Sequence, residues 1–274
     1  SYSTKQIGQV EDYMNIAQYV KAKSLEEAWE LNQKKTAVVF GGGCWLRLSP
    51  QRRIQTAIDL SGLGLDTLAE TEEAFVLGAM VTLRQIETSP ALYAATQGAV
   101  KEALRHIVGV QFRNLATVGG SIFGRFGFSD VLTLFLTLEA EVELHRGGRM
   151  PLAEFAKQGG GNDILTQIII PKKKRRTAYT SLRLNATDFP ILACSVVRTA
   201  DTLLCAVGAR PARAEVRSFD STRGLTEADA TAVATEVAAS MNFEDNTRGS
   251  AAYRRDMAVE LCRRLLLQTG KEEA

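Results

Sequence analysis

The 274-residue chain has few of the residues that would identify a metal centre or a disulfide scaffold. It holds four cysteines and two histidines, and no Cys-x-x-Cys pair occurs among them. Because the cysteines are scattered, we expect reduced thiols, most of them in the core, and no metal site. With 45% hydrophobic and 23% charged residues, the composition is that of an ordinary globular protein. Disorder and low-complexity classes are therefore excluded.

The sequence also lacks a charge excess and a long hydrophobic run. Its 33 basic and 31 acidic residues leave a net charge of +2, so no overall field would recruit nucleic acid or an anionic membrane. The longest apolar stretch, Val131–Leu138, is interrupted by threonines and is too short to span a membrane. No apolar signal region follows the first residues. We expect a cytoplasmic, mixed α and β protein with one large or two modest domains.

Local signals predict the first elements. Ser24-Leu25-Glu26-Glu27 is a capping box, which predicts a helix to about Lys35. Residues 36–40 and 54–60 predict strands, and the first of these ends in Gly41-Gly42-Gly43. A helix, a strand and a glycine turn in this order are half of a βαβ-type unit.

Further elements follow along the chain. A capping box at Thr82–Gln85 predicts a helix over 83–89 that Pro90 stops, and an alanine-rich run predicts one helix over 91–106. A polar, glycine-marked turn is predicted at 113–121. Other expected elements are a buried helix at 131–138, strands at 141–144, 164–170, 193–198 and 202–207, and helices at 227–240 and 249–268.

The basic run Lys172–Arg176 breaks this pattern and marks a candidate domain boundary. A solvated loop is the favoured interpretation of such a run. An acidic partner surface is the second interpretation, and nucleic acid is a distant third.

The turn Gly41-Gly42-Gly43 is the first candidate for binding chemistry. Without Cβ atoms its amide groups can approach an anion closely, as a pyrophosphate site requires, but any tight turn has the same need. The nicotinamide-type G-x-G-x-x-G pattern fits poorly, because Leu46 stands at the third glycine position. A Walker-type loop is absent from the sequence.

The second candidate is Thr117-Val118-Gly119-Gly120-Ser121, where hydroxyls flank two glycines and could bind a diphosphate or a polar ring edge. Asp130 could accept from a sugar hydroxyl, or it could be the N-cap of the helix at 131–138. No catalytic set of acid, base and nucleophile stands out in the sequence.

The order of these segments resembles one protein family. The segments that carry the resemblance are Gly41-Gly42-Gly43-Cys44-Trp45-Leu46, Gly78–Leu83, Gln111–Ile122 with its Arg-Asn-x-Ala-Thr-x-Gly-Gly core, Ser129-Asp130, Asp163–Pro171, Tyr253–Arg255 and Leu261–Arg264. They are similar to the FAD-binding subunit of the molybdenum hydroxylases, such as the medium subunit of carbon monoxide dehydrogenase and the flavin domain of xanthine dehydrogenase. The resemblance covers about residues 15–268.

The resemblance implies an α+β fold of two parts. After a tail at 1–14, a FAD-binding module at 15–172 would comprise a small βαβ subdomain, about 15–70, and a larger antiparallel-sheet subdomain, about 71–172. A C-terminal α+β domain at 177–274 would have a three-stranded sheet packed on helices.

It also implies that FAD lies extended between the two subdomains. The implied cofactor-binding residues are Val39, Phe40, Gly41, Gly42, Gly43, Cys44, Trp45, Leu46, Ile107, Thr117, Gly119, Gly120, Ser121, Gly124, Asp130, Leu165 and Arg183. In the family, an iron–sulfur small subunit delivers electrons from a molybdenum-cofactor large subunit. The FAD passes them on to NAD or another acceptor. The same assembly is expected of this chain, with no nucleic acid and no membrane span.

The chain departs from the family pattern at several positions. Cys44 and Trp45 stand where the family has a hydroxyl residue and an acidic residue, and Phe126-Gly127-Phe128 stands in place of a Ser-Pro pair. Thr180 occupies the position of a basic residue, for which Arg183 is the nearest substitute. These departures leave a second hypothesis open, a scaffold or nucleotide-binding module that keeps the fold without redox activity. A free-standing flavin oxidase is a third hypothesis, for which no substrate-pocket landmark is present.

Overall fold

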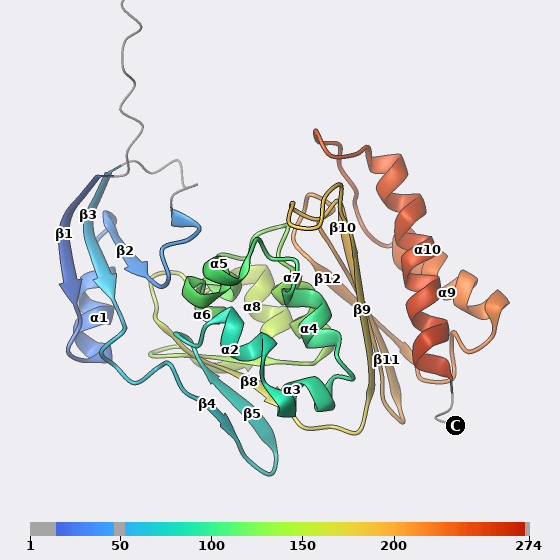
Figure 1. The fold of residues 1–274 in the computed structure, drawn as a ribbon, viewed down its shortest axis with the longest axis horizontal. Helices are drawn as coiled ribbons and strands as arrows, with labels where there is room; N and C mark the ends of the chain where they lie inside the picture. Colours follow the sequence, from blue (N-terminus) through green and yellow to red (C-terminus); the bar gives the residue numbers. More distant parts are fainter. Residues whose placement is uncertain (1–14, 47–52, 272–274) are drawn as a thin grey trace, which may run out of the picture.

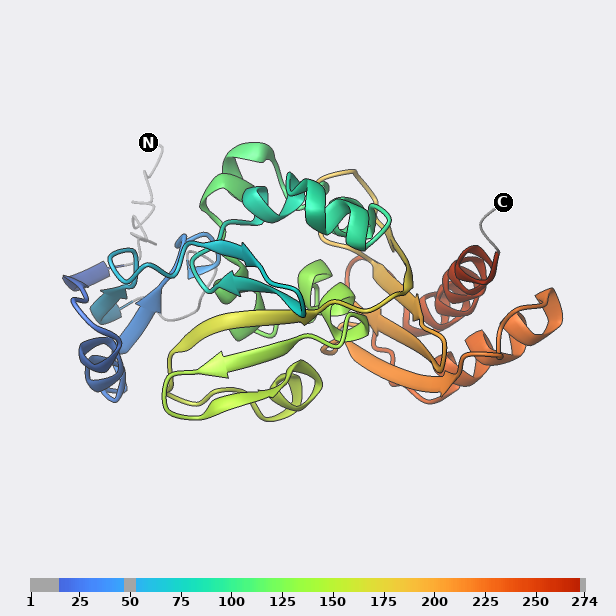
Figure 2. The ribbon, with the colours of Figure 1, turned by 90° about the horizontal axis from the view of Figure 1, so that it is seen from below.

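The computed structural model describes residues 15–46 and 53–271, which form three β-sheets with helices between and around them (Figure 1). The three sheets follow one another along the chain and along the long axis of the molecule (Figure 2). The mixed α and β fold agrees with the predicted class. The tail predicted at 1–14 lies outside the described residues.

The N-terminal sheet is parallel, with the strand order β1-β3-β2. Its elements are β1 (Asn15–Lys21), α1 (Leu25–Asn32), β2 (Ala37–Phe40) and β3 (Arg53–Asp59). The predicted N-cap is confirmed, since the Ser24 side chain accepts from the Glu27 amide, but the Glu27 carboxylate accepts from the Lys23 amide and not from that of Ser24, so the second half of the capping box is absent. The helix ends at Asn32, earlier than predicted. The predicted βαβ-type unit is therefore present.

The middle sheet is antiparallel, with five strands in the order β4-β5-β8-β6-β7. Its strands are β4 (Leu68–Glu70), β5 (Ala74–Gly78), β6 (Glu141–Leu144), β7 (Gly148–Pro151) and β8 (Leu165–Pro171). Seven short helices accompany it: α2 (Leu83–Glu87), α3 (Pro90–Ala95), α4 (Ala99–Leu104), α5 (Val110–Leu115), α6 (Val118–Phe123), α7 (Asp130–Thr137) and α8 (Leu152–Gln158).

Three predictions within this unit are wrong in detail. The single helix expected over 91–106 is two helices, because Gln97 and Gly98 have positive φ and cannot continue an α-helix. The turn expected at 113–121 contains the end of α5 and most of α6. The N-cap of α7 is Ser129, whose side chain accepts from the Leu132 amide, and Asp130 is the first helical residue.

The C-terminal sheet is antiparallel, in the order β12-β11-β10-β9. Its elements are β9 (Arg176–Leu182), β10 (Leu192–Arg198), β11 (Thr202–Gly208), β12 (Glu215–Asp220), α9 (Glu227–Ala239) and α10 (Ala251–Gly270). The sheet therefore has four strands where the resemblance implies three. Strand β12 has no fully buried position and so lacks an apolar signal.

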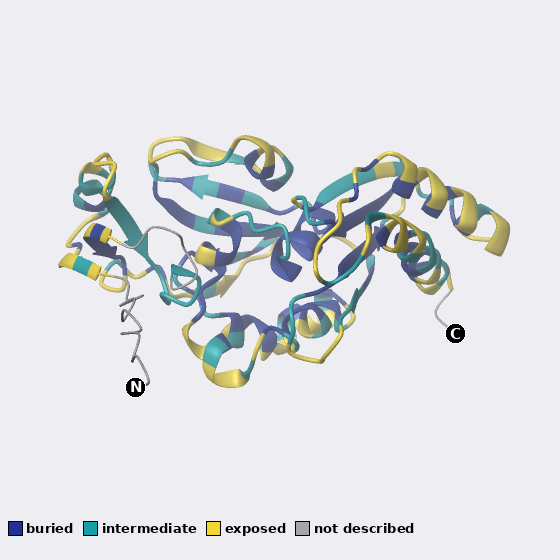
Figure 3. Cartoon of the chain, turned by 90° about the horizontal axis from the view of Figure 1, so that it is seen from above, coloured by how far each residue is buried: buried dark blue, intermediate teal, exposed yellow. Residues whose placement is uncertain are grey.

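Helices cover both faces of this C-terminal sheet. Helices α9 and α10 lie on one face, and their outer turns are exposed (Figures 1 and 3). On the other side lies α7, in which every residue is buried. The hydroxyls of Thr137 on α7 and Ser195 on β10 are 2.6 Å apart. Consequently one core cluster runs from the middle unit into the C-terminal sheet.

The basic run is only partly a solvated loop. Lys172 pairs with Glu70 at 2.6 Å, and Lys173 pairs with Glu139 at 2.6 Å. Arg175 is buried and donates to the Leu138 carbonyl at 2.8 Å. Through these contacts, the connection between β8 and β9 (residues 172–175) packs against the middle unit.

Candidate functional site

The first glycine turn lies at the carboxyl end of β2. Gly43 has a φ of 71°, a conformation that favours glycine. A Cβ on Gly42 would lie 1.7 Å from the Leu115 carbonyl oxygen, so only glycine allows this backbone approach. A Cβ on Gly41 would lie 2.7 Å from the Thr117 hydroxyl oxygen. The two glycine-containing segments of the sequence are therefore in direct contact.

The two segments differ in what their backbone amides do. In α6, Val118 donates to the Val81 carbonyl at 2.8 Å and Gly119 donates to the Ala79 carbonyl at 2.9 Å. Gly120 donates to the Thr117 hydroxyl at 3.2 Å. The amides at this end of α6 are thus already paired within the chain.

The backbone amides of the first glycine turn, in contrast, are not paired within the described part of the chain. Among the described residues, the amide groups of Gly42, Gly43 and Cys44 donate to no protein acceptor. Polar backbone groups left without a protein partner remain available to a ligand. An anionic group in contact with this turn could therefore accept from several amides at once.

A cavity of about 580 Å³ opens against both segments. Of the residues that the resemblance implies, twelve line it: Val39, Gly41, Gly42, Gly43, Cys44, Trp45, Leu46, Thr117, Gly119, Gly120, Gly124 and Leu165. Its volume lies within the ordinary range for small-molecule sites. At Gly120 an added Cβ would meet only the Thr117 hydroxyl, at 3.2 Å, so this position offers the space for a blocking substitution.

Sequence reasoning missed several lining residues. Phe123, Phe126 and Phe128 line the cavity from the segment after the second glycines, and Asn32 lines it from α1. The loop 161–164 also contributes, and the Asn162 carbonyl accepts from the Asn32 side chain at 2.8 Å. Asp163 and Ile164 belong to a segment that carries the family resemblance, whereas no motif indicated Gly161 or Asn162 as site residues.

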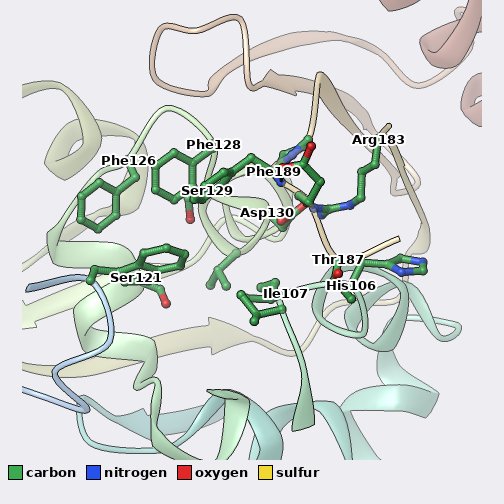
Figure 4. A pocket seen from close by; sticks show the side chains of 15 residues that line it. His106, Ile107, Ser121, Phe126, Phe128, Ser129, Asp130, Arg183, Thr187 and Phe189 are labelled. Carbon is green, nitrogen blue, oxygen red and sulfur yellow. Dashed lines mark hydrogen bonds and ion pairs between the residues drawn. The ribbon is translucent and has the colours of Figure 1, made fainter. Parts of the chain in front are cut away.

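A second cavity of about 100 Å³ adjoins the first (Figure 4). It contains the predicted residues Ile107, Ser121, Asp130 and Arg183, and it shares Trp45 with the larger cavity. The predicted residue Phe40 lines neither cavity. Its ring faces Gly43 and makes an edge contact with Tyr19 at 6.3 Å between centroids.

Asp130 is the centre of a buried polar cluster in the smaller cavity. Its Oδ1 accepts from the Tyr179 hydroxyl at 2.5 Å and from Arg183 Nη2 at 2.5 Å. Burial raises the pKa of the Asp130 carboxyl, while the Arg183 guanidinium opposes that rise. Burial, followed by the neighbouring Asp130 carboxyl, raises the pKa of Tyr179 well above its ordinary value. Tyr179 is therefore a hydrogen-bond donor throughout the physiological pH range.

The thiol of Cys44 shows no sign of activation. It lies in hydrogen-bond contact with the Gly42 carbonyl oxygen at 3.6 Å. Burial raises the pKa of this thiol, so it remains protonated. All four cysteines are free, and three of them are buried, as predicted. The described residues also hold no group of three or more metal-ligating side chains and no helix that could cross a membrane.

Comparison with known families decides the identity. Residues 13–173 match the family described as the FAD binding domain in molybdopterin dehydrogenase, and residues 177–269 match the CO dehydrogenase flavoprotein C-terminal domain. The chain belongs to this family. The chain accordingly contains the FAD-binding domain of the molybdopterin dehydrogenases, and its cofactor is FAD.

Individual relatives cover nearly the whole chain. The uncharacterized protein YgfM of Escherichia coli (strain K12) is 29% identical over 88% of this chain and 91% of its own length. The nicotine 6-hydroxylase medium subunit of Paenarthrobacter nicotinovorans is 27% identical over 92% of this chain and 96% of its own. A chain of CO dehydrogenase from Oligotropha carboxidovorans has the same fold, with a TM-score of 0.82, 21% identity and coverage of 94% and 98%.

The described residues fit FAD. The unpaired amides of the first turn suit the diphosphate. The cavity lining extends from this turn back along β2 to Ala37 and forward to Trp45, and it includes Phe126 and Phe128 as well as residues of α1 and the 161–164 loop. An extended dinucleotide has its diphosphate between two ring systems.

Proposed function

We propose that this chain is the electron-transfer subunit of a molybdenum-hydroxylase-type oxidoreductase, taking electrons from an iron–sulfur partner and passing them to NAD or another acceptor. When bound, FAD supplies the capacity to accept and release those electrons. The chain's own part is to hold, orient and shield the cofactor. Family membership supports the proposal, as does the medium-subunit name of the nicotine 6-hydroxylase relative.

The observation that carries the proposal is the juxtaposition of the two glycine segments at one cavity. We propose that Gly42, Gly43 and Cys44 donate their free amides to the diphosphate. The paired second segment would act differently, since Gly120 leaves space at the cavity without donating its amide to the ligand, while Gly119 packs against Ala79. The remaining proposed contacts come from Val39, Gly41, Trp45, Leu46, Thr117, Gly124 and Leu165, which line the same cavity.

In the smaller cavity, Asp130 and Arg183 already satisfy each other. We therefore propose that they fix the shape of its wall, together with Ile107 and Ser121. The hydroxyl of Ser121 donates to the Thr117 carbonyl at 3.1 Å, so it too is used within the protein.

We further propose that the partners are a molybdenum-cofactor large subunit and an iron–sulfur small subunit. The proposed place of assembly is the cytoplasm, since the four cysteines are free thiols. For the chain itself we propose a FAD-binding module at 15–172 and a C-terminal domain at 177–274.

The test is the visible absorption spectrum of the purified chain after FAD is added and unbound flavin is removed by gel filtration. We expect a bound oxidised-flavin spectrum that Gly120→Trp abolishes, because an indole at this position fills the cavity. The matched control is Ala232→Trp on the exposed side of α9, which should retain FAD. A folded, colourless wild-type chain would instead support the non-redox scaffold.

A further inference from the structure

Five aromatic rings meet where the two cavities adjoin. Trp45 lies 5.0 Å from Phe112, 5.9 Å from Phe126, 5.2 Å from Phe128 and 5.8 Å from Phe189, measured between ring centroids. Phe126 and Phe128 stack nearly parallel, 5.1 Å apart with 8° between their planes. We call these five residues the aromatic cluster.

The cluster brings together parts of the chain that are distant in sequence. Trp45 follows the first glycine turn, Phe112 is on α5, and Phe189 is in the connection before β10. Figure 4 shows Phe126, Phe128 and Phe189 gathered at one side of the smaller cavity, near Ser129 and Asp130. Trp45, Phe126 and Phe128 line both cavities, so they form the wall between them.

Trp45 is also the cluster residue closest in sequence to the free amides. It follows Cys44 directly, and the unpaired amides extend from Gly42 to Cys44. A diphosphate on those amides would bring one of its two ring systems to the cluster. The other ring system would extend back along β2, toward the part of the cavity lined by Asn32, Ala37 and Asn162.

The side chains at the two parts of the cavity favour one orientation of FAD. A fused tricyclic ring gains more than the smaller adenine from an aromatic wall, because stacking grows with the area in contact. Near Asn32 and Asn162, the Asn32 side chain already donates to the Asn162 backbone carbonyl, and the remaining polar atoms of these two amide side chains suit the ring nitrogens of adenine. The aromatic end is therefore the better site for the flavin ring.

We propose that Trp45 is a positioning residue that stacks on the isoalloxazine ring of FAD and so sets the direction in which the cofactor lies. This proposal rests on the proposed function. The acidic residue expected here by family resemblance would offer a charge and no stacking face, so the aromatic cluster gives this chain its own way of holding the ring.

Fluorescence of bound FAD tests the contact directly. Flavin emission is quenched when an indole touches the ring, since the indole transfers an electron to the excited flavin, whereas a phenyl ring does not quench in this way. We expect FAD bound to the wild-type chain to be nearly dark and FAD bound to Trp45→Phe to be bright. The chain has two tryptophans, so Trp29→Phe is the matched control and should stay dark.

The binding affinities of FAD, FMN and ADP test the direction in which the cofactor lies. Trp45→Leu removes the stacking face and should weaken FAD and FMN binding about tenfold while leaving ADP binding unchanged. Trp45→Phe should restore most of the FAD affinity. If Trp45→Leu weakened ADP binding as much as FAD binding, the proposed direction of FAD in the cavity would be wrong.

The outcomes separate this proposal from the proposed function. A wild-type chain that retains no flavin absorbance after gel filtration contradicts the function itself. A chain that retains flavin, with Trp45→Phe as dark as the wild type, contradicts only the role of Trp45.

Discussion

At the scale of single residues, two glycine segments of similar sequence have different roles. Gly42 and Gly43 leave their amides open, whereas Gly119 and Gly120 have theirs paired. The cause is tertiary, because the acceptors Ala79 and Val81 lie in the turn that follows β5. The first turn can thus serve a ligand, and the second serves the packing.

Gly42→Ala is expected to lower the free energy of unfolding by about 1–3 kcal/mol, since its Cβ would lie 1.7 Å from the Leu115 carbonyl oxygen and the backbone must shift. Denaturant unfolding measures the change. Gly109→Ala is the matched control, because its nearest neighbour is the flexible Gln111 side chain at 3.5 Å. Equal stability of the two variants would contradict the close packing of the turns.

A site residue could be predicted from the sequence where its motif is local, and could not where its hydrogen-bond partners are distant in the sequence. The glycine turns, Thr117 and Leu165 were predicted by motif and do line the cavity. Asp130 was predicted as an acceptor for a sugar hydroxyl or as an N-cap; the N-cap is Ser129, and Arg183 and Tyr179 both donate to Asp130 Oδ1. Tyr179 lies on β9 and Arg183 directly follows that strand, so no local pattern around Asp130 could have indicated these partners.

At the scale of elements, a buried ion pair fixes α5 beside the site. Arg113 Nε donates to Glu87 Oε2 at 2.8 Å and Nη2 donates to Oε1 at 3.2 Å, which joins α5 to α2. Arg113 Nη1 also donates to the Ile107 carbonyl at 3.0 Å. Burial acts to raise the pKa of Glu87, but the Arg113 and Arg84 guanidinium groups together hold it below its ordinary value.

Arg113→Leu is expected to lower the free energy of unfolding by about 3–5 kcal/mol at pH 7, because it leaves the Glu87 charge buried without its main partner. In the wild type the contribution of Glu87 is present above about pH 4.5 and is lost as the pH falls, since its folded-state pKa is depressed. In the Arg113→Leu variant, burial of the Glu87 carboxyl favours its protonated form.

The stability gap between the wild type and Arg113→Leu should therefore narrow between pH 7 and pH 4. Urea unfolding at both pH values measures it. The double variant Glu87→Leu with Arg113→Leu should recover much of the loss. A gap that is independent of pH would show that Glu87 is not the group responsible.

Elements were predictable where their signals are local. Ser24 and Thr82 start helices through their own capping contacts, which lie within three residues. Strand β12 was missed, since its alternating exposed residues depend on pairing with β11. The break between α3 and α4 was missed because Gly98 is preceded by Gln97, whose positive φ has no sequence signature.

At the scale of the whole molecule, the proposed domains share a core. Helix α7 has no exposed residue, and its Thr137 contacts Ser195 in the C-terminal sheet. Val197 and Leu204 of that sheet belong to the same buried cluster as the middle unit. The C-terminal sheet therefore completes the burial of the FAD-binding module.

A chain that ends at Pro171 is expected to expose the apolar surface of α7 and to associate or aggregate. Gel filtration and binding of a hydrophobic dye, compared with the full chain, measure this. A monodisperse truncated chain that binds no dye would show that the module buries α7 without the C-terminal sheet.

The composition of the cavity wall has a consequence for how much folded protein a cell contains. Most of the wall comes from the segments 37–46, 116–128 and 161–165, which come together only in the native state. FAD therefore binds the native chain and not the unfolded one, and at a hundredfold excess over Kd it adds about 2.7 kcal/mol of stability. The melting temperature should rise with FAD concentration in a thermal scan and stay constant for Gly120→Trp. The supply of flavin in the cell would then control how much of this chain is folded, in addition to how much of it is active.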